Sequence, residues 1–128
     1  ERAAWVRVVA ERDGYVALAP YASRTPFETW LLPAVHRARF DEASGGELAG
    51  LAALVGHVLE QMSRELERPA FNAVLHTMPF DEADDDAYHW HLELVPRVLR
   101  VSGLDIGVGL PINPVPPEKA ARVLRGRD

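Results

Sequence analysis

The sequence predicts an α+β domain in which a mostly antiparallel sheet packs against one long helix. Two observations lead to this prediction. Short apolar runs of about four to eight residues are separated by short polar or proline-containing connections, as in hairpin-linked strands. One longer stretch repeats apolar residues at three- and four-residue steps, as in a helix with one buried face. The 128 residues, 48% of them hydrophobic, are enough for a single domain spanning residues 1–128 with a buried core.

The first three strands are expected near the amino terminus. Residues 4–10 are mostly apolar and residues 15–18 are apolar, and the polar segment between them ends in Gly14, which predicts a hairpin. Residues 27–32 are rich in β-branched and aromatic side chains and are followed by Pro33. They therefore predict a third strand that ends at this proline.

A long helix is expected from about residue 46 to residue 67. Ser44 and Glu47 have the spacing of a capping box, in which each side chain satisfies an unpaired amide at the start of a helix. Pro69 follows the stretch and ends it. The apolar residues that recur at helical steps are Leu48, Leu51, Ala52, Val55, Val58, Leu59, Met62 and Leu66. This stripe predicts that one face of the helix covers the sheet.

Three further strands and a short helix are expected in the second half of the chain. Residues 71–76, 88–97 and 104–110 are interpreted as extended, and in the last of these two glycines would leave one face without side chains. The segment 117–124 begins with a proline, as first turns of helices often do. The acidic run 81–86 lacks the glycine and distal glutamate of a calcium-binding loop, so we interpret it as a solvated loop.

The segment 88–97 would present two chemically different faces as a strand. Side chains alternate along a strand, so the aromatic and leucine side chains would pack in the core while His89, His91 and Glu93 share the opposite face. Residues two apart lie about 7 Å apart along the backbone, and two such imidazoles can converge on a metal at about 2.0–2.1 Å. A solvent-facing polar side of a half-buried strand gives the same pattern. Both interpretations stay open on this pattern alone.

The composition restricts partners and metal ligands. A formal charge of −5 without clusters of Lys and Arg argues against nucleic acid or an anionic membrane as a partner. Cysteine is absent, so disulfides are excluded and a metal must be held by His, Asp or Glu. The absence of cysteine is also compatible with a reducing compartment, and a cytoplasmic location is expected. Neither a membrane-spanning apolar run nor a signal-peptide pattern is found. The first residue is Glu1 rather than Met, which suggests a fragment or a processed chain.

Four segments carry a resemblance to a known family. They are residues 26–33 (PFETWLLP) with His36, 71–76 (FNAVLH), 89–93 (HWHLE) and 112–118 (INPVPPE). In this order they resemble the carboxyl-terminal half of galactose-1-phosphate uridylyltransferase. Enzymes of this family are built from two copies of the histidine-triad fold, and the chain resembles the second copy only. The resemblance implies a histidine-triad-like fold, with the amino-terminal catalytic half absent.

The resemblance also implies an activity. The family passes a uridylyl group from UDP-glucose to galactose 1-phosphate through a histidine, which gives ping-pong kinetics. That nucleophile lies in the first copy, in a His-Pro-His-Gly-Gln motif that this sequence lacks. The chain would then be a metal-binding, substrate-completing domain, inactive as a transferase alone. The implied partners are UDP-glucose or UDP-galactose, a hexose 1-phosphate, the missing half and a second subunit of a homodimer.

A metal site follows from the same resemblance. Carried over residue by residue, His76, His89 and His91 match the three histidines that bind iron or zinc in the family, whose fourth ligand is a glutamate of the first half. When the match is anchored on Pro96 instead, the paired histidines fall on His91 and Glu93, which makes Glu93 an alternative ligand. Both registers stay open, and zinc or iron is expected in a structural role.

The segment 104–109 resembles one that reaches toward the nucleotide in the partner subunit of the family's dimer. The side chains that some members use there are absent from this sequence, so only backbone contacts are expected. The residues expected near the substrate are Ile106, Gly107, Val108 and Gly109.

Two alternatives come from other functional classes. The first is a stand-alone histidine-triad nucleotide hydrolase or phosphorylase with His91 as its nucleophile. The triad of that superfamily has a third histidine where this chain has Glu93, and a carboxylate there would repel the phosphate. The second is a non-enzymatic, metal-binding interaction module that pairs through an exposed sheet edge. An upstream His-Pro-His-Gly-Gln motif in the natural reading frame would separate this second alternative from the leading hypothesis.

Overall fold

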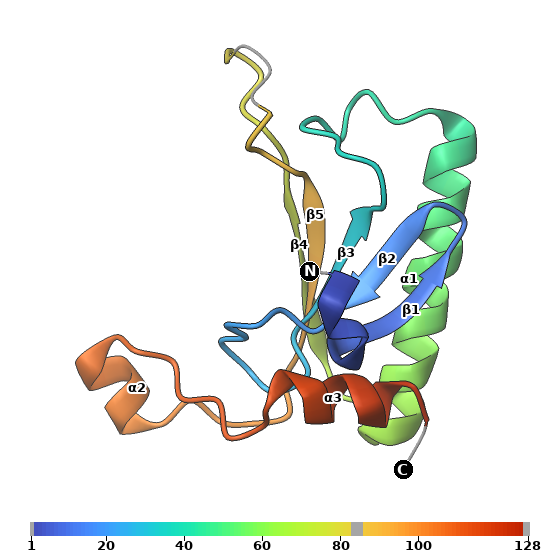
Figure 1. Ribbon diagram of the computed structural model, residues 1–128. Helices are drawn as coiled ribbons and strands as arrows, with labels where there is room; N and C mark the ends of the chain where they lie inside the picture. The colour runs from blue at the N-terminus through green and yellow to red at the C-terminus, as the bar shows by residue number, and fades with distance from the viewer. Residues whose placement is uncertain (1, 83–85, 127–128) are drawn as a thin grey trace.

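A computed structural model describes residues 2–82 and 86–126, and it contains a five-stranded antiparallel sheet with the strand order β1-β2-β3-β5-β4. The strands are β1 (Val8–Arg12), β2 (Tyr15–Leu18), β3 (Thr29–Pro33), β4 (Phe71–His76) and β5 (His91–Pro96). Helix α1 (Gly45–Glu65) lies along one face of the sheet, and α3 (Pro117–Leu124) runs across the end of both (Figure 1). The predicted α+β class with a mostly antiparallel sheet is confirmed.

Helix α1 begins where the sequence predicts. The backbone amide of Glu47 donates to Oγ of Ser44 at 3.3 Å, and the amide of Ser44 donates to Oε2 of Glu47 at 2.8 Å. This capping box satisfies two amides that would otherwise lack partners. At Gly50 the helix passes so close to the β1–β2 turn that a Cβ atom would lie 3.1 Å from the backbone oxygen of Asp13. A residue without a side chain therefore allows this close packing.

The core lies between α1 and the sheet. Leu51, Leu54 and Val58 of α1 are buried against strand residues such as Ala17 and Leu31. The remaining buried apolar residues of the core are Val9, Tyr15, Ala19, Met62, Trp90, Leu94, Ala120, Ala121 and Leu124. The helix contacts mainly β1, β2 and β3. It lies on one face of the sheet, so it leaves the opposite face uncovered.

The sheet differs from the sequence prediction at three strand starts, of which that of β3 is shifted from residue 27 to Thr29. The amino-terminal segment forms a 3-10 helix, Arg2–Arg7, before β1. Strand β5 begins at His91, three residues later than predicted. Continuing the β3–β5 register beyond Leu31 and Leu92 would pair Trp90 with Pro33, which has no amide hydrogen for the ladder. The amide of Trp90 instead donates to the carbonyl oxygen of Arg37 at 2.9 Å.

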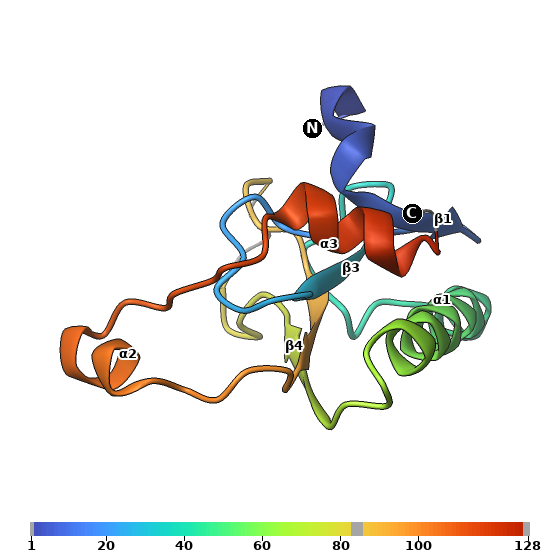
Figure 2. The same cartoon turned by 90° about the horizontal axis from the view of Figure 1, so that it is seen from below.

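The predicted sixth strand is wrong. Residues Gly103–Val108 form a short helix, α2, that projects from the rest of the chain (Figures 1 and 2). Ser102 and Asp105 form a second capping box at its start, and Gly109, with φ of 71°, ends it in the left-handed conformation that glycine adopts without strain. The capping pair and the terminal glycine favour a helix over the extended conformation that the glycine spacing suggested.

The projecting segment 98–112 is the most exposed apolar part of the described chain. Its exposed side chains are Leu99, Val101, Leu104, Ile106, Val108, Leu110 and Ile112. It returns to the body at Asn113, whose Nδ2 donates to the carbonyl oxygens of Ser23 and Thr25, each at 3.1 Å. Helix α3 follows and was correctly predicted. Of the acidic run 81–86, residues 83–85 lie outside the described residues.

Within residues 2–82 and 86–126, none of the helices has the length and apolar character required to cross a bilayer.

Candidate metal centre

Alternation along β5 separates core residues from polar residues. Leu92 and Leu94 pack on the side of α1, whereas His91 and Glu93 point to the opposite face of the sheet. His76 ends the neighbouring strand β4 and is the register partner of His91, so both imidazoles lie on that same face. The two faces predicted for this segment are therefore present from His91 onward, whereas His89 precedes the strand.

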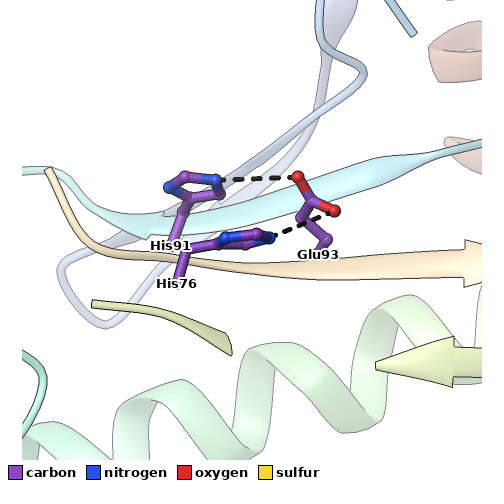
Figure 3. Close-up of side chains that lie close together, drawn as sticks. All are labelled: His76, His91 and Glu93. Atoms are coloured by element: carbon purple, nitrogen blue, oxygen red, sulfur yellow. Dashed lines mark ion pairs between the residues drawn. The ribbon is translucent and has the colours of Figure 1, made fainter. Parts of the chain in front are cut away.

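His76, His91 and Glu93 form a compact cluster of potential metal ligands (Figure 3). Nε2 of His76 lies 3.4 Å from Oε2 of Glu93, and Nε2 of His91 lies 3.7 Å from Oε1. One ligand atom from each residue lies within 4.8 Å of the others. Ligands at about 2.05 Å from a tetrahedral metal are about 3.4 Å apart, so only a small contraction of this cluster would enclose an ion.

The surroundings of the two histidines leave ligand atoms available. Nδ1 of His91 lies 3.1 Å from the carbonyl oxygen of His89. A carbonyl oxygen can only accept, so Nδ1 carries the hydrogen and Nε2 of the neutral ring keeps its lone pair. Nε2 of His76 is shielded from solvent and has no hydrogen-bond partner in the described residues. This donor set of two imidazoles and a carboxylate fits a divalent ion such as zinc or iron.

Stacked rings hold the imidazole of His91 in place. Its ring centroid is 4.3 Å from that of Trp30 on β3 and 4.8 Å from that of His76 on β4, with interplanar angles of 22° and 17°. The three rings come from three adjacent strands, β3, β5 and β4. Rotation of His91 would disrupt both stacks, so the ring is oriented before any ion binds.

A second buried carboxylate and an arginine surround Glu93. Nη2 of Arg24 lies 2.6 Å from Oε2 of Glu93 and 3.4 Å from Oε1 of Glu28. Glu28 is 1% exposed and Glu93 is 5% exposed, so both charges need compensation inside the protein. Burial lowers the pKa of Arg24, but the charges and hydrogen bonds of Glu28 and Glu93 outweigh it and raise the pKa above its usual value. The guanidinium therefore stays charged.

His89 lies apart from this cluster. Its ring contacts His36 edge to face, with centroids 5.3 Å apart, and it lines a cavity of about 260 Å³ with Trp5 and Leu32. Burial lowers the pKa of His89, and the nearby His36 and His91 lower it further, against a hydrogen bond with the backbone of Pro33 that raises it. Of the residues predicted for the metal, the fold brings together His76, His91 and the alternative Glu93, and it separates the side chain of His89 from them.

The four residues expected near the substrate lie elsewhere. Ile106, Gly107, Val108 and Gly109 lie on α2 or cap it, in the projecting segment and apart from the sheet (Figure 2). Their exposure leaves them accessible to another chain.

The sequence analysis did not identify Arg24 and Glu28 as parts of the site. Arg24 is separated from Glu93 by 69 positions, so no local pattern reveals their contact. Glu28 gave a usable signal, because a charged residue inside an otherwise apolar strand-like run is buried only when it has partners. The carbonyl oxygen of His89 was missed as well, because backbone atoms leave no trace in the residue pattern.

Comparison with known sequences gives a family match and several relatives. The family described as "Galactose-1-phosphate uridyl transferase, C-terminal domain" matches residues 1–125. An ADP-glucose phosphorylase from Arabidopsis thaliana is 34% identical over 120 residues, which are 92% of this chain and 34% of that protein. A galactose-1-phosphate uridylyltransferase from Haemophilus influenzae is 31% identical over 95 residues, 73% of this chain and 27% of that protein. The chain thus spans about a third of the length of these curated relatives.

Comparison with solved structures identifies chains of similar fold. An ADP-glucose phosphorylase from Arabidopsis thaliana with bound ADP-glucose has a TM-score of 0.90 at 32% identity, over 99% of this chain and 42% of that chain. A zinc-bound histidine triad family protein from Mycobacterium smegmatis has a TM-score of 0.65 at 19% identity, over 93% of this chain and 81% of that chain. At that identity the likeness concerns the fold alone. The histidine-triad-like fold predicted from the sequence is confirmed.

Proposed function

The chain belongs to the galactose-1-phosphate uridyl transferase C-terminal domain family, and we propose that it is the metal-binding, substrate-completing part of a UDP-glucose:hexose-1-phosphate uridylyltransferase. The family match over residues 1–125 is the observation that carries the proposal. The complete enzyme would pass a uridylyl group to a hexose 1-phosphate through a histidine, in two displacements. UDP-glucose and UDP-galactose would be its nucleotide substrates.

The nucleophile of this reaction would lie outside the chain. The sequence has no His-Pro-His-Gly-Gln motif, and His91 is a poor substitute. Its ring is enclosed by the rings of Trp30 and His76, and its Nε2 faces the carboxylate of Glu93. A negative charge at that position would repel an approaching phosphate. The isolated chain is therefore expected to be inactive, and His91 is assigned to the metal.

The metal would be structural. His76, His91 and Glu93 would hold zinc or iron, and the ion would join the edge strand β4 to β5. His89, the third histidine of the sequence-based set, would act through its carbonyl oxygen, which orients His91. The exposed edge of β4 leaves room for a further ligand from the proposed amino-terminal half.

Two surfaces would be covered by other chains or domains. Strand β4 is an edge strand whose Phe71, Val74 and Leu75 are exposed, which suits packing against the missing half. The projecting segment 98–112 exposes seven large apolar side chains, which suits a contact with the second subunit of a homodimer. Its backbone around Gly107 would reach the nucleotide there.

A second candidate reaction is favoured by one specific observation. The Arabidopsis thaliana ADP-glucose phosphorylase matches 92% of this chain at 34% identity. A related enzyme of this kind would pass the nucleotidyl group of ADP-glucose to inorganic phosphate. The same two-part architecture and the same metal centre would serve both reactions.

Product analysis of the full-length protein separates the two reactions. The protein is incubated with UDP-glucose and galactose 1-phosphate, and separately with ADP-glucose and phosphate, and nucleotide products are quantified by chromatography. UDP-galactose formation supports the first reaction, whereas ADP formation supports the second. The proposal fails if neither product forms, or if residues 1–128 alone form either product at the rate of the full-length protein.

A further inference from the structure

Arg24 bridges two buried carboxylates beside the proposed metal centre. Its Nη2 reaches Oε2 of Glu93 at 2.6 Å and Oε1 of Glu28 at 3.4 Å. The contact with Glu93 is short, and short hydrogen bonds between two charged groups are among the strongest in proteins. The same oxygen of Glu93 also lies 3.4 Å from His76, so Arg24 engages one of the three groups that would hold the ion.

Glu28 fixes the backbone that carries Arg24. Oε2 of Glu28 accepts the backbone amides of Arg24 at 2.7 Å and Thr25 at 3.4 Å, and Oε1 accepts the indole N–H of Trp30 at 2.9 Å. Trp30 also stacks on His91. One buried carboxylate therefore aligns both the arginine that contacts Glu93 and the ring that orients His91.

Asn113 holds the same loop from the other side. Its Nδ2 donates to the carbonyl oxygens of Ser23 and Thr25, which flank Arg24 in the chain. The side chain of Arg24 is 55% exposed, so without these restraints its guanidinium would exchange its carboxylate contacts for water. Asn113 also ends the projecting segment, which links the base of that segment to the metal centre.

The two oxygens of Glu93 consequently have different surroundings. Oε2 accepts from Arg24 and lies 3.4 Å from Nε2 of His76, while Oε1 lies 3.7 Å from Nε2 of His91, and Arg24 does not contact it (Figure 3). A carboxylate binds a metal through one oxygen or through both. We infer that Arg24, aligned by Glu28 and Asn113, is a positioning residue that occupies Oε2 and restricts Glu93 to binding the ion through one oxygen. This inference rests on the metal centre of the proposed function.

The expected effect is a change in coordination. In Arg24→Met, Oε2 loses its strongest partner and becomes available to the ion, so the coordination number rises by about one. X-ray absorption at the zinc edge measures this number. The visible absorption of the cobalt-substituted protein provides a second readout, because its intensity falls as the coordination number increases. If Arg24 only stabilised the fold, Arg24→Met would change neither the coordination number nor the cobalt absorption of the folded protein.

The experiment uses the full-length protein loaded with zinc or cobalt. Arg37→Met is the matched control, since Arg37, in the loop between β3 and α1, also pairs with a glutamate, Glu47, in the first turn of α1. Subtracting the spectrum of His91→Ala isolates the contribution of this centre. Asn113→Ala releases the loop without changing a charge and is expected to shift both signals in the same direction, which keeps the test decisive if Arg24→Met does not fold.

Two failures are distinguishable. If the wild type and His91→Ala contain the same amount of metal, the proposed centre itself is wrong. If metal is lost in His91→Ala but Arg24→Met and Asn113→Ala both retain the wild-type coordination number and cobalt spectrum, the centre stands and the role of Arg24 is overturned.

Discussion

His76 and His91 are register partners on adjacent antiparallel strands, and their imidazoles stack with centroids 4.8 Å apart and planes 17° from parallel. The pairing brings a histidine from the edge strand β4 beside one from β5, and Glu93 lies two residues further along β5. The proposed metal centre thus depends on strand register. A slip by one residue would move His76 to the other face of the sheet.

Removal of the metal should lower stability, because an ion bound only by the folded chain stabilises it. Zinc at about a hundred times its dissociation constant should increase the free energy of unfolding by about 2.7 kcal/mol. Thermal or urea unfolding with zinc and with a chelator measures the difference. His57→Ala on α1 should retain the full effect and His91→Ala should lose it; equal zinc effects in both variants would contradict the assignment.

Shortening Leu54 should destabilise the core of α1 against the sheet. Leu54 is fully buried, so Leu54→Ala removes packed methyl groups and leaves a cavity, at a cost of about 2–5 kcal/mol. Leu48 on the same helix is 39% exposed and provides a matched control with the same chemical change. Urea unfolding should show a much smaller loss for Leu48→Ala. Similar losses in the two variants would place the core elsewhere.

The capping box of α1 should make stability depend on pH in the acidic range. Hydrogen bonds with Ser44 are the main cause that lowers the pKa of Glu47; desolvation opposes them, and the charge of Arg37 lowers the pKa to a smaller extent. The folded chain therefore binds fewer protons than the unfolded chain, so this contribution is present above the ordinary glutamate pKa and is lost as the pH falls through the lowered one. Glu47→Gln should flatten that part of the stability profile, whereas Glu60→Gln should leave it unchanged.

The apolar projecting segment should drive self-association of the chain. Ile106 is 76% exposed on this segment, and Val35 is 71% exposed on the loop after β3 and serves as a control of similar exposure. Sedimentation velocity should show a smaller associated fraction for Ile106→Ser than for the wild type, and no change for Val35→Ser. A dilute wild-type chain that sediments as a monomer would argue against this role.

Local patterns were sufficient for much of the fold. The capping pair Ser44 and Glu47 located the start of α1, and alternation placed Leu92 and Leu94 in the core with His91 and Glu93 opposite them. Both signals are short-range, because they depend on residues two to three positions apart.

The features that the sequence did not predict depend mainly on contacts between residues far apart in the chain. The sequence left both His89 and Glu93 open as partners of His91, because their placement depends on where β5 begins. The strand begins at His91, after the amide of Trp90 donates to the carbonyl oxygen of Arg37. Arg24 reaches Glu93 from another part of the chain. At α2, the capping pair Ser102 and Asp105 indicates a helix, but the prediction followed the glycine spacing, which suggested a strand.

Metal content of the purified protein tests the central claim, that His76, His91 and Glu93 form the metal centre. Mass spectrometry is applied to the wild type and to His76→Ala, His91→Ala, Glu93→Ala and His89→Ala. The last variant keeps the backbone carbonyl that orients His91. We expect zinc or iron to be lost in the first three variants and retained in His89→Ala. Loss of the metal in His89→Ala with full retention in Glu93→Ala would contradict the account and restore the set of three histidines.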